Sequence, residues 1–458
     1  MEKKALRRIA AGCLLFCTVF LTGCSIESGD GLASLPKLPG EYVTLQKKLD
    51  DILAKGFTYA VAEDGPNRQA VQLVDVDGDG NDETISFFRS ATSGEYSVYI
   101  HKKQGEGYKE IGHTKGYGKY LREVHYVKSS PNGSVAIVLC WAGEDNTSYG
   151  MTVHMVGKDG LIDALTVKYA NMSINDLDGD GVEEIVTISY DRGTNAMSIA
   201  AYGFMGESCT QLTETALSAD IKNVVAITEG ITSDSGRALY VDSLMNTGGY
   251  LTDIVKYRNG SFHNATMDMD SMTSSSTWRQ VSVQCRDMDG DGIYEIPLAT
   301  MLPGYGDPNS SETRWKLKWT RFLPDNQTQL VMTTFHSTAE DWFFLWPERW
   351  GENVTVLKKN EAGISKTIFF VPPAGRKNGE YRLEPDETNT LLNIYAFTGD
   401  SRREYFENSG MGLLKETSNT IFAYSIPANN YGQYTLTEEE MQSCFHMITK
   451  EWGMEGYN

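Results

Sequence analysis

Three nine-residue segments carry carboxylates at a spacing that suits a bound cation. Each reads D-x-D-G-D-G-x-x-E, with acidic residues at positions 1, 3, 5 and 9 and glycines at positions 4 and 6. The glycines permit a positive-φ turn that points alternate oxygens inward, and position 7 can add a backbone carbonyl. The candidate ligand positions are Asp75, Asp77, Asp79, Asn81 and Glu83, then Asp176, Asp178, Asp180, Val182 and Glu184, then Asp287, Asp289, Asp291, Ile293 and Glu295.

Calcium is the ion that we expect, because it accepts about six to eight oxygen ligands in flexible geometry, whereas magnesium requires a near-ideal octahedron. An EF-hand would also bind calcium, but it needs a bidentate Glu at position 12 of its loop and a helix on each side. Position 12 is Ser86, Thr187 or Leu298 here, and short β-branched runs follow the segments. The pattern therefore predicts β-hairpins closed by an ion. One copy would fit a plain acidic turn equally well, but three copies favour the ion.

The three segments resemble the calcium hairpins of FG-GAP/VCBS-type repeats, which occur in the β-propeller of integrin α subunits and in many bacterial surface proteins. The resemblance covers three short loops and the strands that flank them. It implies calcium as the cofactor and suggests a β-propeller. It implies no activity, because fold and function separate readily.

The N-terminus has the features of a lipoprotein export signal. Basic residues precede a short apolar run that ends in Leu21-Thr22-Gly23-Cys24, which resembles the bacterial lipobox. Cleavage before Cys24 predicts a signal peptide over 1–23 and a diacylated Cys24, which would anchor the chain to the bacterial cell membrane on its extracytoplasmic side. The polar stretch 24–40 would be the tether. A plain secretory signal with a chance cysteine is the alternative.

Charge argues against one class of partner. The formal net charge of the 458 residues is −20. This balance argues against nucleic acid or an anionic lipid surface as the partner. The three acidic loops account for part of the negative charge.

The spacing of the loops predicts a repeat. They start at residues 75, 176 and 287, and an ion-free strand–turn–strand pattern lies within each interval, at 124–139 and 224–241. We therefore predict an all-β fold, a β-propeller of about seven blades over 57–434 with calcium hairpins in alternate blades. A β-sandwich, or two tandem β domains, is the competing architecture.

Helices are predicted at the two ends of the body, over 41–56 and 435–458. The second begins with a capping box, Thr437-Glu-Glu-Glu440. Its apolar face is expected to comprise Met441, Cys444, Phe445, Ile448 and Trp452. The sequence leaves the state of four cysteines open between disulfides and buried free thiols: Cys140, Cys209, Cys285 and Cys444.

No catalytic motif stands out. The histidines lack zinc-hydrolase spacing, and no G-x-S-x-G elbow or Walker loop is present. The aromatic stretch 341–350 would be a contact surface if exposed, but buried strand faces are the favoured interpretation. We expect a non-catalytic module that binds a protein or carbohydrate ligand. An extracytoplasmic enzyme acting on polysaccharide or cell-wall polymer, with its site at the propeller channel, is the alternative. An accessory subunit for an exported partner is a third hypothesis.

Overall fold

The computed structural model describes residues 42–144, 149–323, 327–361, 363–373, 376–377, 380–381, 383–428 and 432–448. The predicted signal peptide (1–23), the lipidation site Cys24 and the tether (24–40) lie outside these residues, as does Trp452. No helix among the described residues is long and apolar enough to cross a membrane. The chain forms two compact units. Of the described residues, the first unit comprises 42–61, 70–74 and 82–115, and the second comprises 62–69, 75–81 and those from 116 to 448.

The first unit is a helix packed on one antiparallel sheet. Helix α2 (Val43–Leu53) lies within the predicted 41–56 and buries Leu45, Leu49 and Ile52 against Phe88. In the sheet, β1 and β2 both pair with β3, which is followed by β4 and β5. The strands are β1 (Phe57–Tyr59), β2 (Val71–Val74), β3 (Glu83–Ser90), β4 (Tyr96–Gln104) and β5 (Gly107–Lys115).

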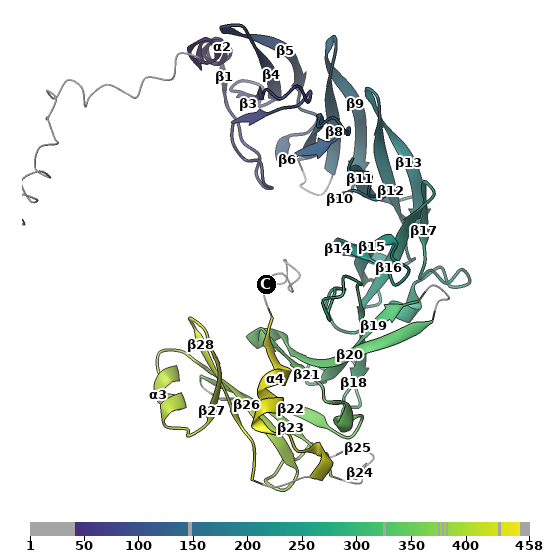
Figure 1. Cartoon of the computed structure of the whole chain (residues 1–458), viewed down its shortest axis with the longest axis vertical. Coiled ribbons are helices and arrows are strands. Elements are labelled where there is room, and N and C mark those ends of the chain that lie inside the picture. Colours follow the sequence, from purple (N-terminus) through teal and green to yellow (C-terminus); the bar gives the residue numbers. More distant parts are fainter. Residues whose placement is uncertain are drawn as a thin grey trace, which may run out of the picture. The chain divides into compact units, whose positions relative to one another are not determined.

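The second unit contains five larger antiparallel sheets, which follow one another in chain order (Figure 1). The first consists of β6 (Tyr120–Lys128), β7 (Val135–Ala142), β8 (Tyr149–Gly157) and β9 (Gly160–Tyr169). The next two consist of β10 (Asn171–Asn175), β11 (Glu184–Asp191), β12 (Ala196–Met205) and β13 (Ser208–Ala216), and of β14 (Ile221–Ile231), β15 (Arg237–Met245), β16 (Tyr250–Arg258) and β17 (Ser261–Asn264).

The last two of these sheets have five strands each. One consists of β18 (Ile296–Met301), β19 (Trp315–Phe322), β20 (Thr328–Ser337), β21 (Trp342–Leu345) and β29 (Phe445–Met447). The other consists of β22 (Thr355–Glu361), β23 (Ile364–Phe370), β26 (Thr390–Thr398), β28 (Thr420–Ser425) and β27 (Gly412–Glu416). The remaining elements are the pair β24 (Arg376–Lys377) and β25 (Glu380–Tyr381), helices α3 (Arg402–Glu407) and α4 (Glu438–Cys444), and the short turns η2 (Ser275–Thr277), η3 (Thr338–Glu340), η4 (Glu348–Trp350) and η5 (Gly432–Tyr434).

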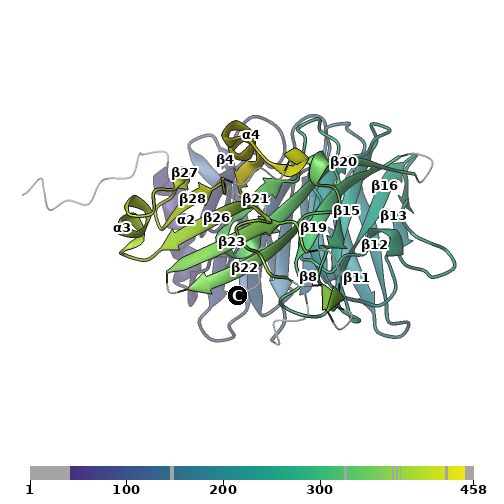
Figure 2. The same ribbon diagram turned by 90° about the horizontal axis from the view of Figure 1, so that it is seen from below.

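Neighbouring sheets of the second unit pack face to face. One apolar cluster joins the sheet of β6–β9 to that of β10–β13, and another joins the latter to β14–β17. Strands between two such faces are apolar on both sides, so that seven of the eight residues of β7 are buried. Figure 2 shows the antiparallel strands of these sheets side by side. Stacked four-stranded antiparallel sheets are the blades of a β-propeller, so the predicted all-β fold is confirmed.

The predicted alternation of loops is also confirmed. Acidic loops connect β2 to β3 and β10 to β11, and the third precedes β18. The intervening sheets have plain turns at the same place, after β6 and after β14. Among the described residues there are six sheets of four or five strands, where about seven blades were predicted. The count is lower because 314–319 and 341–346, which both have strand-like patterns, contribute strands to a single sheet.

Two local predictions were wrong. The run Val281–Val283 before the third loop has the β-branched pattern of a strand, but it forms no strand, and Arg286 and Glu295 on the two sides of that loop are joined by an isolated bridge. The C-terminal helix, predicted to continue past Phe445, ends at Cys444, although its capping box is present at Thr437 and Glu440. Phe445–Met447 instead form β29, which pairs with β21. This pairing places the ring of Phe445 on Trp342 and the ring of His446 on Phe343, contacts that a continued helix would lose.

Buried aromatic rings and thiols complete the core. Trp342, Phe344, Trp346 and Trp350 all belong to the cluster between the last two sheets. The buried interpretation of 341–350 is therefore confirmed. All four cysteines are free thiols, and the three among them that are fully buried are Cys140, Cys209 and Cys285.

Candidate metal centres

The second acidic loop folds around the carboxylate of Asp176. Its two oxygens accept hydrogen bonds from the backbone N–H groups of Gly179, at 2.7 Å, and Gly181, at 3.1 Å. Both glycines have positive φ, 80° and 83°, a conformation that residues with a Cβ rarely adopt. The nine-residue pattern therefore encodes the loop locally, through its glycines and its first aspartate.

This loop brings three predicted ligands together. Oxygens of Asp176, Asp178 and Glu184 lie within 4.8 Å of one another. Glu184 is only 6% exposed, and one of its oxygens accepts a hydrogen bond from the N–H of Leu177 at 2.9 Å. Burial, together with the neighbouring aspartates, raises the pKa of Glu184 to about 7. A buried carboxylate facing two others is costly without a cation, so these residues fit a metal ion.

The remaining positions of this loop have other roles. Asp180 accepts a hydrogen bond from the N–H of Val182 at 2.7 Å and lies outside the close cluster. Among the described residues, no Lys or Arg side chain forms an ion pair with Asp176, Asp178 or Glu184. The three clustered carboxylates of the second loop therefore have no ion-paired protein cation, in the part of the chain that the structure describes.

The third loop has the same scaffold. Asp287 accepts hydrogen bonds from the N–H groups of Gly290, at 2.7 Å, and Gly292, at 2.8 Å. Oxygens of Asp287, Asp289 and Asp291 lie within 4.8 Å of one another. Burial raises the pKa of Glu295 to about 7, and its side chain accepts a hydrogen bond from the N–H of Met288 at 2.9 Å. Ile293 donates its N–H to Asp291.

A protein cation already occupies part of the third loop. The guanidinium of Arg321, on β19, lies 2.9 Å from Asp289, 2.8 Å from Asp291 and 2.9 Å from Glu295. A planar guanidinium that contacts three carboxylates replaces part of the positive charge that a metal ion would supply. The loop pattern gave no signal of this residue, because its partners lie in a different part of the sequence.

Strand register explains why the second loop has no such cation. Ile296 pairs with Thr320, and Ile185 pairs with Tyr202 in the other sheet. The residue that corresponds to Arg321 is therefore Gly203. The position opposite the last carboxylate of the loop, on the neighbouring strand, is the slot that differs between the two sheets. It is occupied by the guanidinium of Arg321 in one sheet, and by Gly203, which has no side chain, in the other.

The first loop crosses the boundary between the two units. In the second unit, Asp75 accepts hydrogen bonds from the N–H groups of Gly78, at 2.8 Å, and Gly80, at 2.7 Å. Asp79 accepts one from Asn81 at 2.9 Å, and Asp77 accepts one from the N–H of Asp79. In the first unit, Glu83 begins β3, is fully buried and lies 3.3 Å from the ammonium of Lys102. By register, since Thr84 pairs with His101, Lys102 holds the slot that corresponds to Arg321.

Each loop in the second unit is bonded to the plain turns of its neighbours. Glu183 accepts a hydrogen bond from the N–H of Lys128 at 2.8 Å, and Arg237 donates to the carbonyl of Asp176 at 2.9 Å. Farther along, the N–H of Tyr294 donates to the carbonyl of Ile231 at 3.0 Å. The geometry of one loop therefore affects the contacts between successive sheets.

Comparison with known proteins assigns this chain to no family. No family model matches the chain, and no curated protein matches it. A protein from Lactobacillus plantarum is 10% identical, with 71% of this chain and 86% of that one covered and a TM-score of 0.23. The β-propeller domain of the trilobed protease from Pyrococcus furiosus, which has an open velcro topology, is 12% identical, with 69% and 94% covered and a TM-score of 0.27. An exotype rhamnogalacturonan lyase is 13% identical, with 70% and 55% covered and a TM-score of 0.21. All three TM-scores are below 0.5, so these likenesses carry no argument about this chain.

Proposed function

We propose that the chain is a calcium-stabilised β-propeller lipoprotein, anchored to the bacterial cell membrane through Cys24 and displayed outside the cytoplasm. Its role is that of a non-catalytic module that binds a protein or carbohydrate ligand. The single observation that carries the proposal is the second loop, where Asp176, Asp178 and the buried Glu184 converge. The resemblance of all three loops to FG-GAP/VCBS calcium hairpins supports the same assignment, and the lipobox-like segment before Cys24 supports the anchor.

The donor set favours calcium over other metal ions. The side chains that converge offer only carboxylate oxygens, which suit hard cations, whereas zinc and copper sites use His and Cys. Bound there, calcium would neutralise the cluster and hold the loop closed. Arg237 and Lys128 bond the same loop to the neighbouring turns, so the ion would brace three sheets. The role that we assign to it is therefore structural.

Chelation is expected to lower the melting temperature by several degrees. When the calcium concentration is tenfold to hundredfold above the dissociation constant of a site, binding contributes about 1–3 kcal/mol of stability. That contribution disappears in excess EDTA. The measurement is thermal unfolding of the purified chain in EDTA and in millimolar calcium. Superimposable melting curves in the two buffers would refute a structural ion.

The variant Glu184→Gln separates the ion from the carboxylate cluster. In calcium it should be less stable than the wild-type chain, because a ligand is lost. In EDTA at about pH 8 it should be at least as stable, because the amide removes a buried charge that faces Asp176 and Asp178. The control is Asp159→Asn, an exposed change outside the loops. A loss of stability that is the same in both buffers would assign Glu184 a packing role only.

The third loop should respond differently, because Arg321 competes with the ion. In Arg321→Met, three carboxylates lose their guanidinium, so we expect lower stability in EDTA and a larger gain on adding calcium than in the wild-type chain. Calorimetric titration should show calcium affinity at this loop rising by about tenfold or more. Lys318→Met on the same strand, whose ammonium pairs with Glu352, is the matched control. A calcium response equal to that of the control would contradict the competition.

A further inference from the structure

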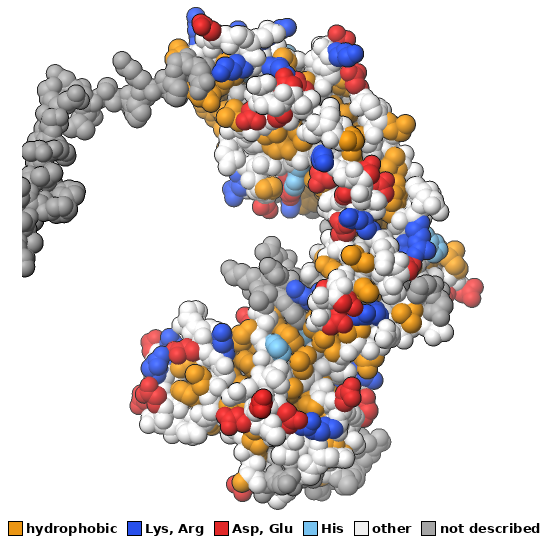
Figure 3. Space-filling model, in the orientation of Figure 1, with side chains coloured by type: hydrophobic (Ala, Val, Ile, Leu, Met, Phe, Trp, Pro, Cys, Tyr) orange, Lys and Arg blue, Asp and Glu red, His pale blue; other side chains and the backbone are white. Residues whose placement is uncertain are grey.

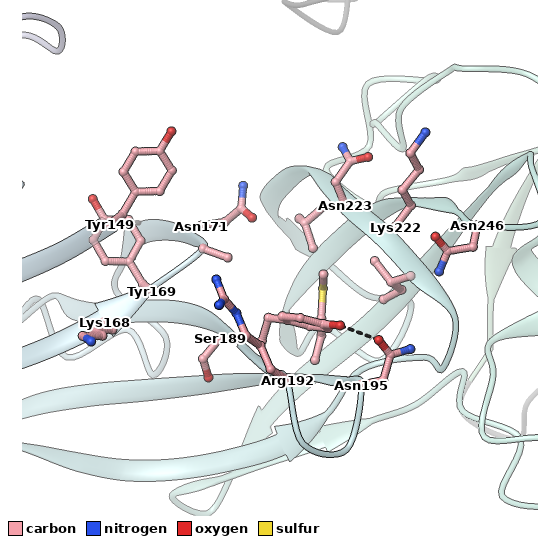
Figure 4. Close-up of a pocket in the computed structure, with 15 residues that line it drawn as sticks. Tyr149, Lys168, Tyr169, Asn171, Ser189, Arg192, Asn195, Lys222, Asn223 and Asn246 are labelled. Atoms are coloured by element: carbon pink, nitrogen blue, oxygen red, sulfur yellow. Dashed lines mark hydrogen bonds between the residues drawn. The ribbon is translucent and has the colours of Figure 1, made fainter. Parts of the chain in front are cut away.

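A cavity of about 920 Å³ lies where the sheets of β6–β9, β10–β13 and β14–β17 adjoin. Its volume is in the range of about 300–1,000 Å³ that is usual for small-ligand pockets. Figure 4 shows Tyr149 and Tyr169 on one side of the hollow, Lys222, Asn223 and Asn246 on the other, and Arg192 between them. The side chains come from three sheets, so no single sequence motif could reveal the site.

The charge of this lining is opposite to that of the chain. Lys168, Arg192 and Lys222 line the cavity, and no Asp or Glu does, although the net charge of the sequence is −20. On the face shown in Figure 3, acidic and basic side chains are instead interspersed. Three cations around one hollow in an acidic chain indicate an anionic ligand.

Nearby carboxylates are engaged by neutral donors and leave these cations available. Asp191, next to Arg192, accepts hydrogen bonds from the N–H of Gly193 at 2.8 Å and from the hydroxyl of Thr194 at 2.9 Å. Asp220 accepts one from the amide of Asn246 at 3.1 Å. None of the three cations forms an ion pair with a carboxylate of the described residues. The turn that presents Arg192 is further fixed by a hydrogen bond from the Tyr190 hydroxyl to Asn195.

The rest of the lining suits a sugar better than a peptide. Four side-chain amides line the cavity, and an amide has donors and an acceptor that match hydroxyl groups. The oxygen of Asn195 and the nitrogen of Asn246 already form hydrogen bonds within the protein, so these two side chains offer only their other amide atom to a ligand. Three tyrosines add flat rings, and those of Tyr149 and Tyr169 stack with centroids 6.0 Å apart. The lining amides and rings are Asn171, Asn195, Asn223 and Asn246, and Tyr149, Tyr169 and Tyr190. Since Asp, Glu and His do not line it, the cavity lacks the carboxylate pair that glycoside hydrolysis uses.

We propose that this cavity binds an acidic oligosaccharide, with Lys168, Arg192 and Lys222 contacting its carboxylate or sulfate groups and the asparagines contacting its hydroxyls. The inference rests on the binding role proposed above and assigns that role a site and a ligand class. The proposed role is binding alone, and the ligand undergoes no reaction.

The test is calorimetric titration of the calcium-loaded chain with a hyaluronan oligosaccharide, its carboxyl-reduced form and an oligoglutamate. We expect the uronate-containing sugar to bind about tenfold or more tightly than its reduced form, because charge-assisted hydrogen bonds are lost on reduction. Arg192→Gln and Lys222→Gln should each weaken binding by about tenfold and reduce its salt dependence. Lys158→Gln, an exposed change in the turn between β8 and β9, should leave binding unchanged.

Three results would overturn the assignment. The first is no binding of the uronate sugar, and the second is equal binding by Arg192→Gln and the wild-type chain. The third is tighter binding of oligoglutamate than of the uronate sugar, which would indicate that the cavity binds acidic peptides. Melting curves in EDTA and calcium on the same samples keep the two proposals apart. A calcium-dependent melting temperature without sugar binding refutes only the cavity assignment, whereas sugar binding without calcium dependence refutes the structural ion.

Discussion

Replacing Arg279 by methionine is expected to lower the free energy of unfolding by about 3–5 kcal/mol, because it leaves a buried carboxylate without its partner. Arg279 and Asp242 are both fully buried, with 2.6 Å between their nitrogen and oxygen. The guanidinium also donates to the carbonyl of Val283 at 2.9 Å and to the hydroxyl of Thr252 at 2.8 Å. Apart from Arg279, none of the groups in these contacts carries a positive charge that would neutralise the carboxylate of Asp242.

The consequence extends to the third acidic loop. Asp242 accepts a hydrogen bond from the N–H of Cys285 at 3.3 Å, two residues before Asp287. Denaturant unfolding of Arg279→Met, Asp242→Leu and the double variant would give the coupling energy of the pair. The double variant should be more stable than Arg279→Met alone, because removing both charges avoids the unpaired one. A loss below about 1 kcal/mol in Arg279→Met would contradict the expected role of the pair.

Trp350→Ala should have an effect of similar size, about 3–5 kcal/mol, through the loss of a buried ring and the cavity it leaves. Trp350 is 0% exposed. Its ring lies 5.8 Å from that of Phe344 and 5.2 Å from that of Trp346, centroid to centroid, and its indole N–H donates to the carbonyl of Tyr434 at 2.8 Å. The side chain therefore holds the C-terminal segment to the last two sheets.

The control for this variant is Trp278→Ala, since Trp278 is 45% exposed and should cost less than about 1 kcal/mol. Chemical denaturation of both variants measures the difference. If 341–350 were a contact surface, Trp350→Ala would leave stability unchanged and affect ligand binding instead. Equal losses in the two variants would contradict the burial of Trp350.

Much of the fold was predictable because its signals are local. The acidic loops follow from glycines at positive φ and from an aspartate that accepts two backbone N–H groups within five residues of itself. The alternation of acidic loops and plain turns follows from the spacing of these motifs. The capping box of α4 is likewise contained in four consecutive residues.

What the sequence did not show depends on contacts between distant segments. The end of α4 at Cys444 is set by the pairing of Phe445–Met447 with β21 (Trp342–Leu345), a strand far earlier in the chain. Arg321 reaches the third loop only because β19 pairs with β18 in a particular register. The cationic cavity draws on three sheets, so its side chains come together only once those sheets are in place.

The slot beside the last loop carboxylate means that the acidic motif alone is an incomplete indicator of ion binding. The last carboxylates of the three identical patterns lie opposite Lys102, Gly203 and Arg321 on the neighbouring strands, so two of these carboxylates have a protein cation beside them and one has none. If such loops bind calcium as proposed, a single substitution at this facing position is expected to change how far a loop depends on the ion. Surveys of these motifs should therefore take the facing residue into account as well as the carboxylates.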